Sequence, residues 1–372
     1  MKRVAGWLVL VLLITGAAAF AAKGPDVQTL QIGDRAPDFE LPGVDGKNHS
    51  LKDFAKAKIL AVIFTCNHCP TAQAYEERLK KIVSDYKGKG VAFVAISPND
   101  PKAVRLDELG YTDLSDSFDE MKIRAKERKF NFPYLYDGDT ESVSRAYGPV
   151  ATPHVFLFDA ERKLRYDGAP DDSENPAAVK TPYMRNALDA LLEGKPVPIE
   201  VTKARGCSIK WSDKRESVVE GMKKLAAEPV SLDRISAESI TTLLKNDSNR
   251  LRMINVWATW CGPCNQEFPE IVTINRMYRH RAFELIAISA DDPEKKDDVL
   301  GFLKKREASN KNFLFDSSDK QKLIATINHK WQGGIPFTLL IRPGGEVVYT
   351  HEGLIDPIEV RRVIVQQLRS RP

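Results

Sequence analysis

One arrangement of residues occurs twice in this 372-residue chain and limits what it can fold into. The apolar run Ile59 to Phe64 leads into Thr65-Cys66-Asn67-His68-Cys69-Pro70 and then a helical pattern. A second run of β-forming residues leads through Trp257 into Trp260-Cys261-Gly262-Pro263-Cys264 and a polar helical stretch. Continuous apolar runs are typical of buried strands. The sequence therefore predicts a strand, a C-x-x-C motif and a helix in each half. The chain is long enough for two domains with separate cores.

A proline before an apolar strand also occurs in each half. Thr152-Pro153 precedes the run His154 to Phe158, and Ile335-Pro336 precedes the run Phe337 to Ile341. The first half is longer between its cysteines and this proline, and an insertion around Lys102 to Lys129 accounts for the difference. The repeat is thus one of architecture, with a mixed α/β fold in each half. Further helices are expected at Tyr183 to Leu192, Gln321 to Trp331 and from Pro357.

The cysteine pairs are positioned for redox chemistry. A cysteine at the first turn of a helix meets unpaired N–H groups and the positive end of the helix dipole, which lower its pKa. Cys261 is therefore the expected attacking thiolate, and Cys264 resolves a mixed disulfide by forming an intramolecular one. Cys66 and Cys69 are expected to work in the same way. His68 is expected to stabilise the Cys66 thiolate and make this pair the more oxidising one; the alternative is that His68 faces solvent.

The second half, roughly Glu228 to Pro372, resembles thioredoxin-fold proteins of the TlpA/ResA type in its Trp-Cys-Gly-Pro-Cys motif and Glu267-Phe268-Pro269. The resemblance implies a cis peptide bond at Pro336, with Ile335 presenting backbone groups to a substrate chain. Asn255 stands where thioredoxin carries a buried acid. Glu267 is therefore a candidate for proton transfer to Cys264; alternatively it is a solvated acid in the first helical turn.

The first half, about Leu30 to Trp211, resembles a peroxiredoxin-like (AhpC/TSA-like) subgroup with a C-x-x-C. The resemblance implies a cis bond at Pro153, beside Thr152, and raises the alternative of a thiol peroxidase re-reduced by the second domain. Thr65 is out of register with the threonine of peroxidatic enzymes, and no proline stands seven residues before either cysteine. Disulfide exchange is therefore favoured. Cys207 is a candidate resolving thiol or, equally, a small buried apolar residue.

Other classes of function receive less support. One C-x-x-C with His68 offers at most three metal ligands, whereas a closed zinc site needs four, which argues against a structural zinc site. A metal- or thiol-binding module without turnover is a third alternative. No cofactor beyond the redox disulfides is expected. A net charge of +4 gives no support to nucleic-acid binding.

The N-terminus carries Lys2 and Arg3, an apolar segment from Val4 to Ile14 and small residues up to Ala22. This pattern predicts a signal peptide over residues 1–22, with an uncleaved membrane anchor as the alternative. Domain boundaries are expected at 30–200 for the peroxiredoxin-like domain, 201–228 for a linker with Cys207, and 229–372 for the TlpA-like domain.

The sequence thus predicts a periplasmic or secreted protein of two tandem thioredoxin-like folds that exchanges disulfides with protein thiols. A membrane or periplasmic redox partner is expected, and electron transfer between the two sites is a further hypothesis.

Overall fold

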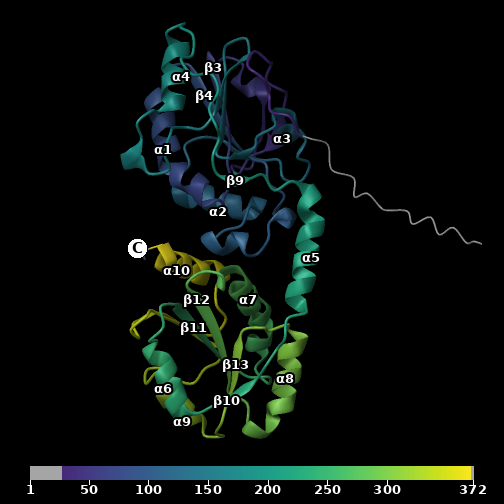
Figure 1. Cartoon of the computed structure of the whole chain (residues 1–372), viewed down its shortest axis with the longest axis vertical. Coiled ribbons are helices and arrows are strands. Elements are labelled where there is room, and N and C mark those ends of the chain that lie inside the picture. The colour runs from purple at the N-terminus through teal and green to yellow at the C-terminus, as the bar shows by residue number, and fades with distance from the viewer. Residues whose placement is uncertain (1–26, 370–372) are drawn as a thin grey trace, which may run out of the picture.

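The computed structural model describes residues 27–369, which form two α/β domains stacked end to end (Figure 1). The predicted signal peptide lies outside the described residues. Helix α5 (Arg215–Ala226) runs along one side of the junction and joins the two domains (Figure 1). Among residues 27–369, no helix combines the length and the apolar composition needed to cross a membrane.

The first domain is built on a five-stranded sheet in the order β5-β4-β3-β7-β8. The strands β3, β4 and β5 are parallel, and β7 and β8 are antiparallel to their neighbours. Their bounds are β3 Ile59–Phe64, β4 Val91–Ser97, β5 Tyr134–Tyr136, β7 His154–Phe158 and β8 Leu164–Gly168. Every side chain of β3 and β7 is buried, as expected for central strands covered on both faces.

Helices cover both faces of this sheet, and short strands border it. Aromatic and aliphatic side chains of α1 and α4 form one apolar cluster with β3 and β4, and Tyr147 of α3 belongs to the cluster on the opposite face. The bounds are α1 Pro70–Tyr86, α2 Phe118–Arg128, α3 Ser142–Tyr147, α4 Tyr183–Leu192, β1 Glu40–Pro42, β2 Asn48–Ser50, β6 Ala151–Thr152 and β9 Cys207–Ser208. The predicted helix at Tyr183 to Leu192 is confirmed.

The second domain repeats this plan with one extra edge strand, in the order β10-β13-β12-β11-β14-β15. Strand β11 pairs in parallel with β12 and antiparallel with β14, as β3 does with β4 and β7. The bounds are β10 Asp233–Ile235, β11 Leu251–Trp257, β12 Phe283–Ser289, β13 Lys311–Phe315, β14 Phe337–Ile341, β15 Val347–Glu352, α6 Ala237–Lys245, α7 Gly262–Tyr278, α8 Lys296–Lys305, α9 Lys320–Ile327 and α10 Pro357–Arg369. Both domains are thioredoxin-like folds, as predicted.

One helix is shorter than predicted. The expected helix to Trp331 ends at Ile327, because Asn328 is extended, with φ −164°. Trp331 instead folds back and stacks on Phe337, with ring centroids 4.6 Å apart, and its Nε1–H donates to the carbonyl of Gly334. Tertiary packing of the indole outweighs helix propensity here.

The predicted insertion around residues 102–129 forms the junction between the domains. Val104 and Leu109 belong to the same apolar cluster as Met277 of α7. The hydroxyl of Tyr278 donates to the carbonyl of Thr112 at 2.7 Å. In Figure 1 this segment lies between the first sheet and helices α7 and α10. A segment that sequence spacing shows only as extra length therefore holds the two domains together.

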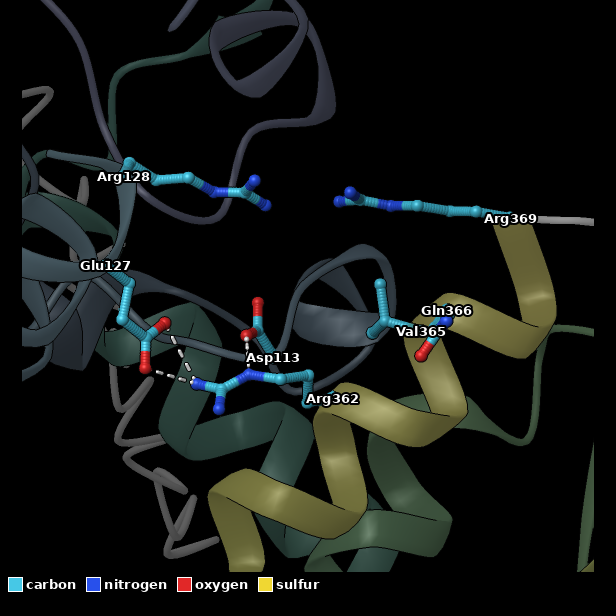
Figure 2. A pocket seen from close by; sticks show the side chains of 7 residues that line it. All are labelled: Asp113, Glu127, Arg128, Arg362, Val365, Gln366 and Arg369. Atoms are coloured by element: carbon cyan, nitrogen blue, oxygen red, sulfur yellow. Dashed lines mark hydrogen bonds and ion pairs between the residues drawn. The ribbon is translucent and has the colours of Figure 1, made fainter. Parts of the chain in front are cut away.

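Charged side chains line a cavity of about 610 Å³ at this junction (Figure 2). Arg362 of α10 bonds to Glu127 at 2.8 Å and to Asp113 at 3.3 Å across the domain boundary. Arg128 and Arg369 point toward each other from opposite sides of the cavity (Figure 2). Its lining contains none of the cysteines, so it is a feature of the domain contact.

Candidate active sites

The second site lies where β11 meets α7. Cys261 is the N-cap of α7, and its Sγ accepts a hydrogen bond from the backbone N–H of Cys264 at 3.1 Å. Cys261 and Cys264 form a disulfide with an S–S distance of 2.05 Å. The peptide bond before Pro336 is cis, which confirms the prediction. Cys261 Sγ lies 3.5 Å from the carbonyl oxygen of Ile335, so the sulfur faces the chain next to that proline.

Asn255 of β11 and Glu267 of α7 form a buried polar pair in the second domain. Glu267 is 6% exposed, so the alternative of a solvated first-turn acid is wrong. Its Oε1 accepts from Asn255 Nδ2 and its Oε2 from the backbone N–H of Ile355, both at 2.9 Å. Burial raises the pKa of Glu267, because it disfavours the charged form. Such a carboxyl can hold a proton closer to neutral pH than an exposed glutamate does.

The first site differs from the second in which cysteine begins the helix. Helix α1 starts at Pro70, and Cys69 is its N-cap. Cys69 Sγ accepts from the N–H of Ala72 at 3.5 Å and lies 3.3 Å from the carbonyl oxygen of Thr152. The peptide bond between Thr152 and Pro153 is cis, as predicted. Cys69 therefore corresponds to Cys261, and the position of Cys264 is taken by Ala72.

This correspondence corrects the expected order of the first pair. Cys66 precedes the helix and is buried with its Sγ 3.1 Å from Thr152 Oγ1. Burial, together with a hydrogen bond to Cys69, raises the pKa of Cys66 well above its usual range. Hydrogen bonds from the thiols of Cys207 and Cys66 hold the pKa of Cys69 well below its usual range. The prediction that Cys66 is the stabilised thiolate is wrong, because the helix N-terminus and the donors meet at Cys69.

Cys207 lies beside this pair. The β9 residues pair antiparallel with β6, and the backbone N–H of Cys207 donates to Cys69 Sγ at 3.3 Å. Its side chain packs against Cys66 and Cys69 but is only partly buried. The hydrogen bond to Cys69 and then burial raise the pKa of Cys207. Three thiols therefore meet at the first site, and all three are free in this structure.

His68 is buried, so the alternative that it faces solvent is wrong. Its Nδ1 lies 2.5 Å from Asp116, a buried residue of the insertion. Burial alone lowers the pKa of His68, but the charge and hydrogen bond of Asp116 outweigh this and raise it. The protonated form of this imidazole is therefore favoured next to the thiols, and its Nε2 is buried and has no hydrogen-bond partner among the described residues.

No pattern in the sequence points to Asp116, because it is 48 residues away from His68 in the chain. Ligand atoms of Cys66, His68 and Asp116 lie within 4.8 Å of one another, as a metal site would require. The carboxylate, however, already accepts from the N–H groups of Asn67 and His68, from His68 Nδ1 and from Asn99. With these four hydrogen bonds, the Asp116 carboxylate is better suited to hold the imidazole of His68 in place than to coordinate a metal ion.

The sequence matches two families of redox proteins, one in each half. Residues 32–167 match the AhpC/TSA family, and residues 226–363 match the redoxin family. This chain is a thioredoxin-fold redox enzyme with an AhpC/TSA domain and a redoxin domain in tandem. Both regions contain the sulfur sites described above, apart from Cys207, which lies between the two matches.

Named relatives of this redox enzyme are thiol-disulfide oxidoreductases. It is 26% identical over 160 residues to the thiol-disulfide oxidoreductase ResA of Bacillus cereus, which covers 42% of this chain and 82% of the relative. It is 29% identical over 132 residues to ResA of Oceanobacillus iheyensis, covering 35% and 65% of the two chains. A solved structure of a hypothetical protein from Sinorhizobium meliloti 1021 is 37% identical, covers 50% of this chain and 97% of its own, and has a TM-score of 0.44.

Proposed function

We propose that this redox enzyme is an extracytoplasmic thiol-disulfide oxidoreductase with two active sites that exchange disulfides with protein thiols. One observation carries the proposal. In each domain the sulfur at a helix N-terminus lies within 3.5 Å of the carbonyl that precedes a cis-proline. A thiolate at that point is stabilised by the helix, and the adjacent backbone offers an edge to an incoming chain.

At the second site, Cys261 attacks a substrate disulfide and Cys264 resolves the mixed disulfide. Ile335 and Pro336 position the substrate chain, and Glu267 exchanges a proton with Cys264. Trp260, next to Cys261, is 68% exposed and offers an apolar contact to a protein substrate. The relatives named as oxidoreductases support this assignment.

At the first site, Cys69 is the attacking thiolate and Thr152 with Pro153 forms the corresponding edge. Asp116 holds His68 and raises the pKa of its imidazole, and the protonated imidazole favours the ionised state of Cys69. A stabilised thiolate is a better leaving group, so the oxidised first site is expected to be the stronger oxidant of the two.

The location and the partners follow from chemistry that needs persistent disulfides. The predicted signal peptide supports a periplasmic or secreted protein, and a membrane or periplasmic redox protein would reset its disulfides. N-terminal sequencing of protein recovered from a periplasmic fraction tests this; an intact Met1 in the cytoplasmic fraction would contradict it.

Activity measurements on the full chain test the two sites separately. Cys261→Ser/Cys264→Ser silences the second site, and Cys66→Ser/Cys69→Ser/Cys207→Ser silences the first. We expect each variant to retain part of the reduction of insulin disulfides by dithiothreitol, and the combined variant to lose it. Full activity of the combined variant would refute the proposal.

The same variants test electron transfer between the sites. Each single-site chain is reduced and mixed with the other in its oxidised form, and the thiols are trapped over time. Equilibration between Cys69 and Cys261 supports transfer between sites, and two independent redox states contradict it.

A second candidate function is peroxide reduction at the first site. The match to the AhpC/TSA family and the ionised Cys69 favour it. Cys69 would take one oxygen from hydrogen peroxide as a sulfenic acid, and a neighbouring thiol would then release water and form a disulfide. Thiol trapping distinguishes the two functions: selective, rapid loss of Cys69 to peroxide supports a peroxidase, and slow loss with rapid exchange supports an oxidoreductase.

A further inference from the structure

The edge next to the first cis-proline is already occupied by the chain itself. Strand β9 pairs antiparallel with β6, so that Cys207 lies directly opposite Thr152. At the second site no strand among residues 27–369 pairs with Ile335. The segment 205–208 thus takes a place in the first domain that no strand takes in the described part of the second domain.

A glycine makes this close approach feasible. Gly206 has φ +144°, and a Cβ at this position would lie 1.9 Å from the carbonyl oxygen of Thr152. A side chain here would push the strand off β6. Two hydrogen bonds fix the strand beyond it: Lys210 N–H donates to Asn99 Oδ1 at 2.9 Å, and Asp100 N–H donates to the Lys210 carbonyl at 3.0 Å.

The three sulfurs differ in access to solvent. Cys66 and Cys69 are 3% and 0% exposed, whereas Cys207 is partly exposed. Cys207 packs on Cys69 and donates its backbone N–H to that sulfur. A thiol or disulfide in solution therefore meets Cys207 before it can reach Cys69.

We propose that segment 205–208 is a built-in substrate strand and that Cys207 is the sulfur through which the first site exchanges with protein thiols. In this scheme, which rests on the proposed function, one disulfide moves between Cys66–Cys69 and Cys69–Cys207. The buried pair Cys66 and Cys69 can then exchange electrons with thiols in solution through Cys207, without becoming exposed itself.

The steps balance as follows. A substrate thiolate attacks Cys207 of the Cys69–Cys207 disulfide; that S–S bond breaks, and Cys69 leaves as a thiolate. The second substrate thiolate attacks the mixed disulfide, forms the substrate disulfide and releases Cys207, which takes up a proton. Two electrons pass from the substrate dithiol to the protein, and the other substrate proton goes to solvent. In the internal step, Cys66 attacks Cys69, and its proton passes to Cys207 as that bond breaks.

Disulfide mapping tests the scheme in the full chain carrying Cys261→Ser/Cys264→Ser. This parent and its Cys66→Ser and Cys207→Ser derivatives react with limiting oxidised glutathione, are quenched in acid, alkylated and digested for mass spectrometry. We expect both disulfides in the parent, only Cys69–Cys207 in Cys66→Ser, and only Cys66–Cys69 in Cys207→Ser. The reaction of Cys207→Ser should be at least tenfold slower, and Ser217→Ala, an exposed serine on helix α5 outside the strand, should match the parent.

Displacement of the strand gives an independent measurement. Gly206→Ala should raise the rate of native-state alkylation of Cys69 at least tenfold. Gly194→Ala is the matched control, because Gly194 also has a positive φ, +69°, but open space around its Cβ.

Each outcome decides one idea. If Cys207→Ser reacts as fast as the parent and Cys66–Cys69 is the sole disulfide in the parent, the built-in strand is refuted while exchange at the first site stands. If the parent forms no disulfide at the first site, both this inference and exchange at that site fail. A Cys69 alkylation rate unchanged in Gly206→Ala would also overturn the role of the strand.

Discussion

Replacement of Asp116 by asparagine tests how the first site is held. Asp116 is fully buried, and its carboxylate accepts hydrogen bonds from the N–H groups of Asn67 and His68 at 2.8 and 3.0 Å. It also accepts from His68 Nδ1 at 2.5 Å and from Asn99 Nδ2 at 2.7 Å. Asp116→Asn keeps the size of the side chain, removes its charge and converts one acceptor oxygen into a donor NH2.

The expected cost follows from the lost contacts. Hydrogen bonds to a charged group contribute about 1.5–3 kcal/mol each, and removal of one partner of a buried ion pair costs about 3–5 kcal/mol. The two estimates overlap, since the same contacts enter both. We therefore expect the unfolding free energy of the first domain to fall by about 3–5 kcal/mol, which corresponds to a melting temperature lower by about 10 °C.

The pH dependence gives a sharper signature. Burial alone raises the pKa of Asp116, but the charge of His68 and the hydrogen bonds lower it on balance, so its stabilisation is complete above about pH 4 and is lost in acid. The pKa of His68 is raised, so its stabilisation is complete below about pH 6.5 and is lost as pH rises through the folded value. The effect of Asp116→Asn should therefore be largest between about pH 4 and pH 6.5.

Urea unfolding at pH 5.5, followed by circular dichroism, measures the change. Asp119→Asn is the control, since Asp119 lies in the first turn of the nearby helix α2 and its side chain is 89% exposed in an ion pair with Lys122. Surface pairs of this kind contribute little, so this variant should unfold like the parent. An equal midpoint for Asp116→Asn and Asp119→Asn would refute the argument that Asp116 holds His68.

Two further predictions concern the second domain and the junction. Glu267→Gln should slow thiol exchange at the second site about 10²-fold and remove one limb of its pH profile; stability at pH 7 should not fall, because burial already disfavours the charged carboxyl. Glu270→Gln is the matched control and should keep full activity: Glu270 lies on the same helix, and burial also raises the pKa of its carboxyl. Gly110→Ala should loosen the junction, because its Cβ would lie 2.5 Å from the carbonyl oxygen of Met277. Small-angle scattering should then show a larger radius of gyration, whereas Gly221→Ala, with open space around it, should leave the radius unchanged.

Local patterns predicted much of the fold. The runs at Ile59 to Phe64 and Phe337 to Ile341 are strands with those bounds, and the helix from Pro357 starts where it was expected. These segments are long, apolar or periodic, so their local preference agrees with the tertiary structure. The cis bonds at Pro153 and Pro336 were also predicted, from the resemblance of each half to a known family.

The arrangement of the first site was not predictable in the same way. A C-x-x-C followed by a helix is compatible with either cysteine as the N-cap, and Pro70 starts α1 one residue after Cys69. Asp116 and Cys207 reach the site from distant parts of the chain. No periodicity links such residues, because their meeting depends on how the insertion and β9 pack.

The sequence alone determined two strand–C-x-x-C–helix units, each with a proline directly before a later apolar strand. These features are local, because each depends only on residues that are neighbours in the chain. Only the tertiary structure decided that Cys69 begins the helix, that Asp116 fixes His68, and that β9 covers the edge beside Pro153. Burial and hydrogen bonds between distant segments set the ionisation of each thiol, and those quantities exist only once the chain has folded.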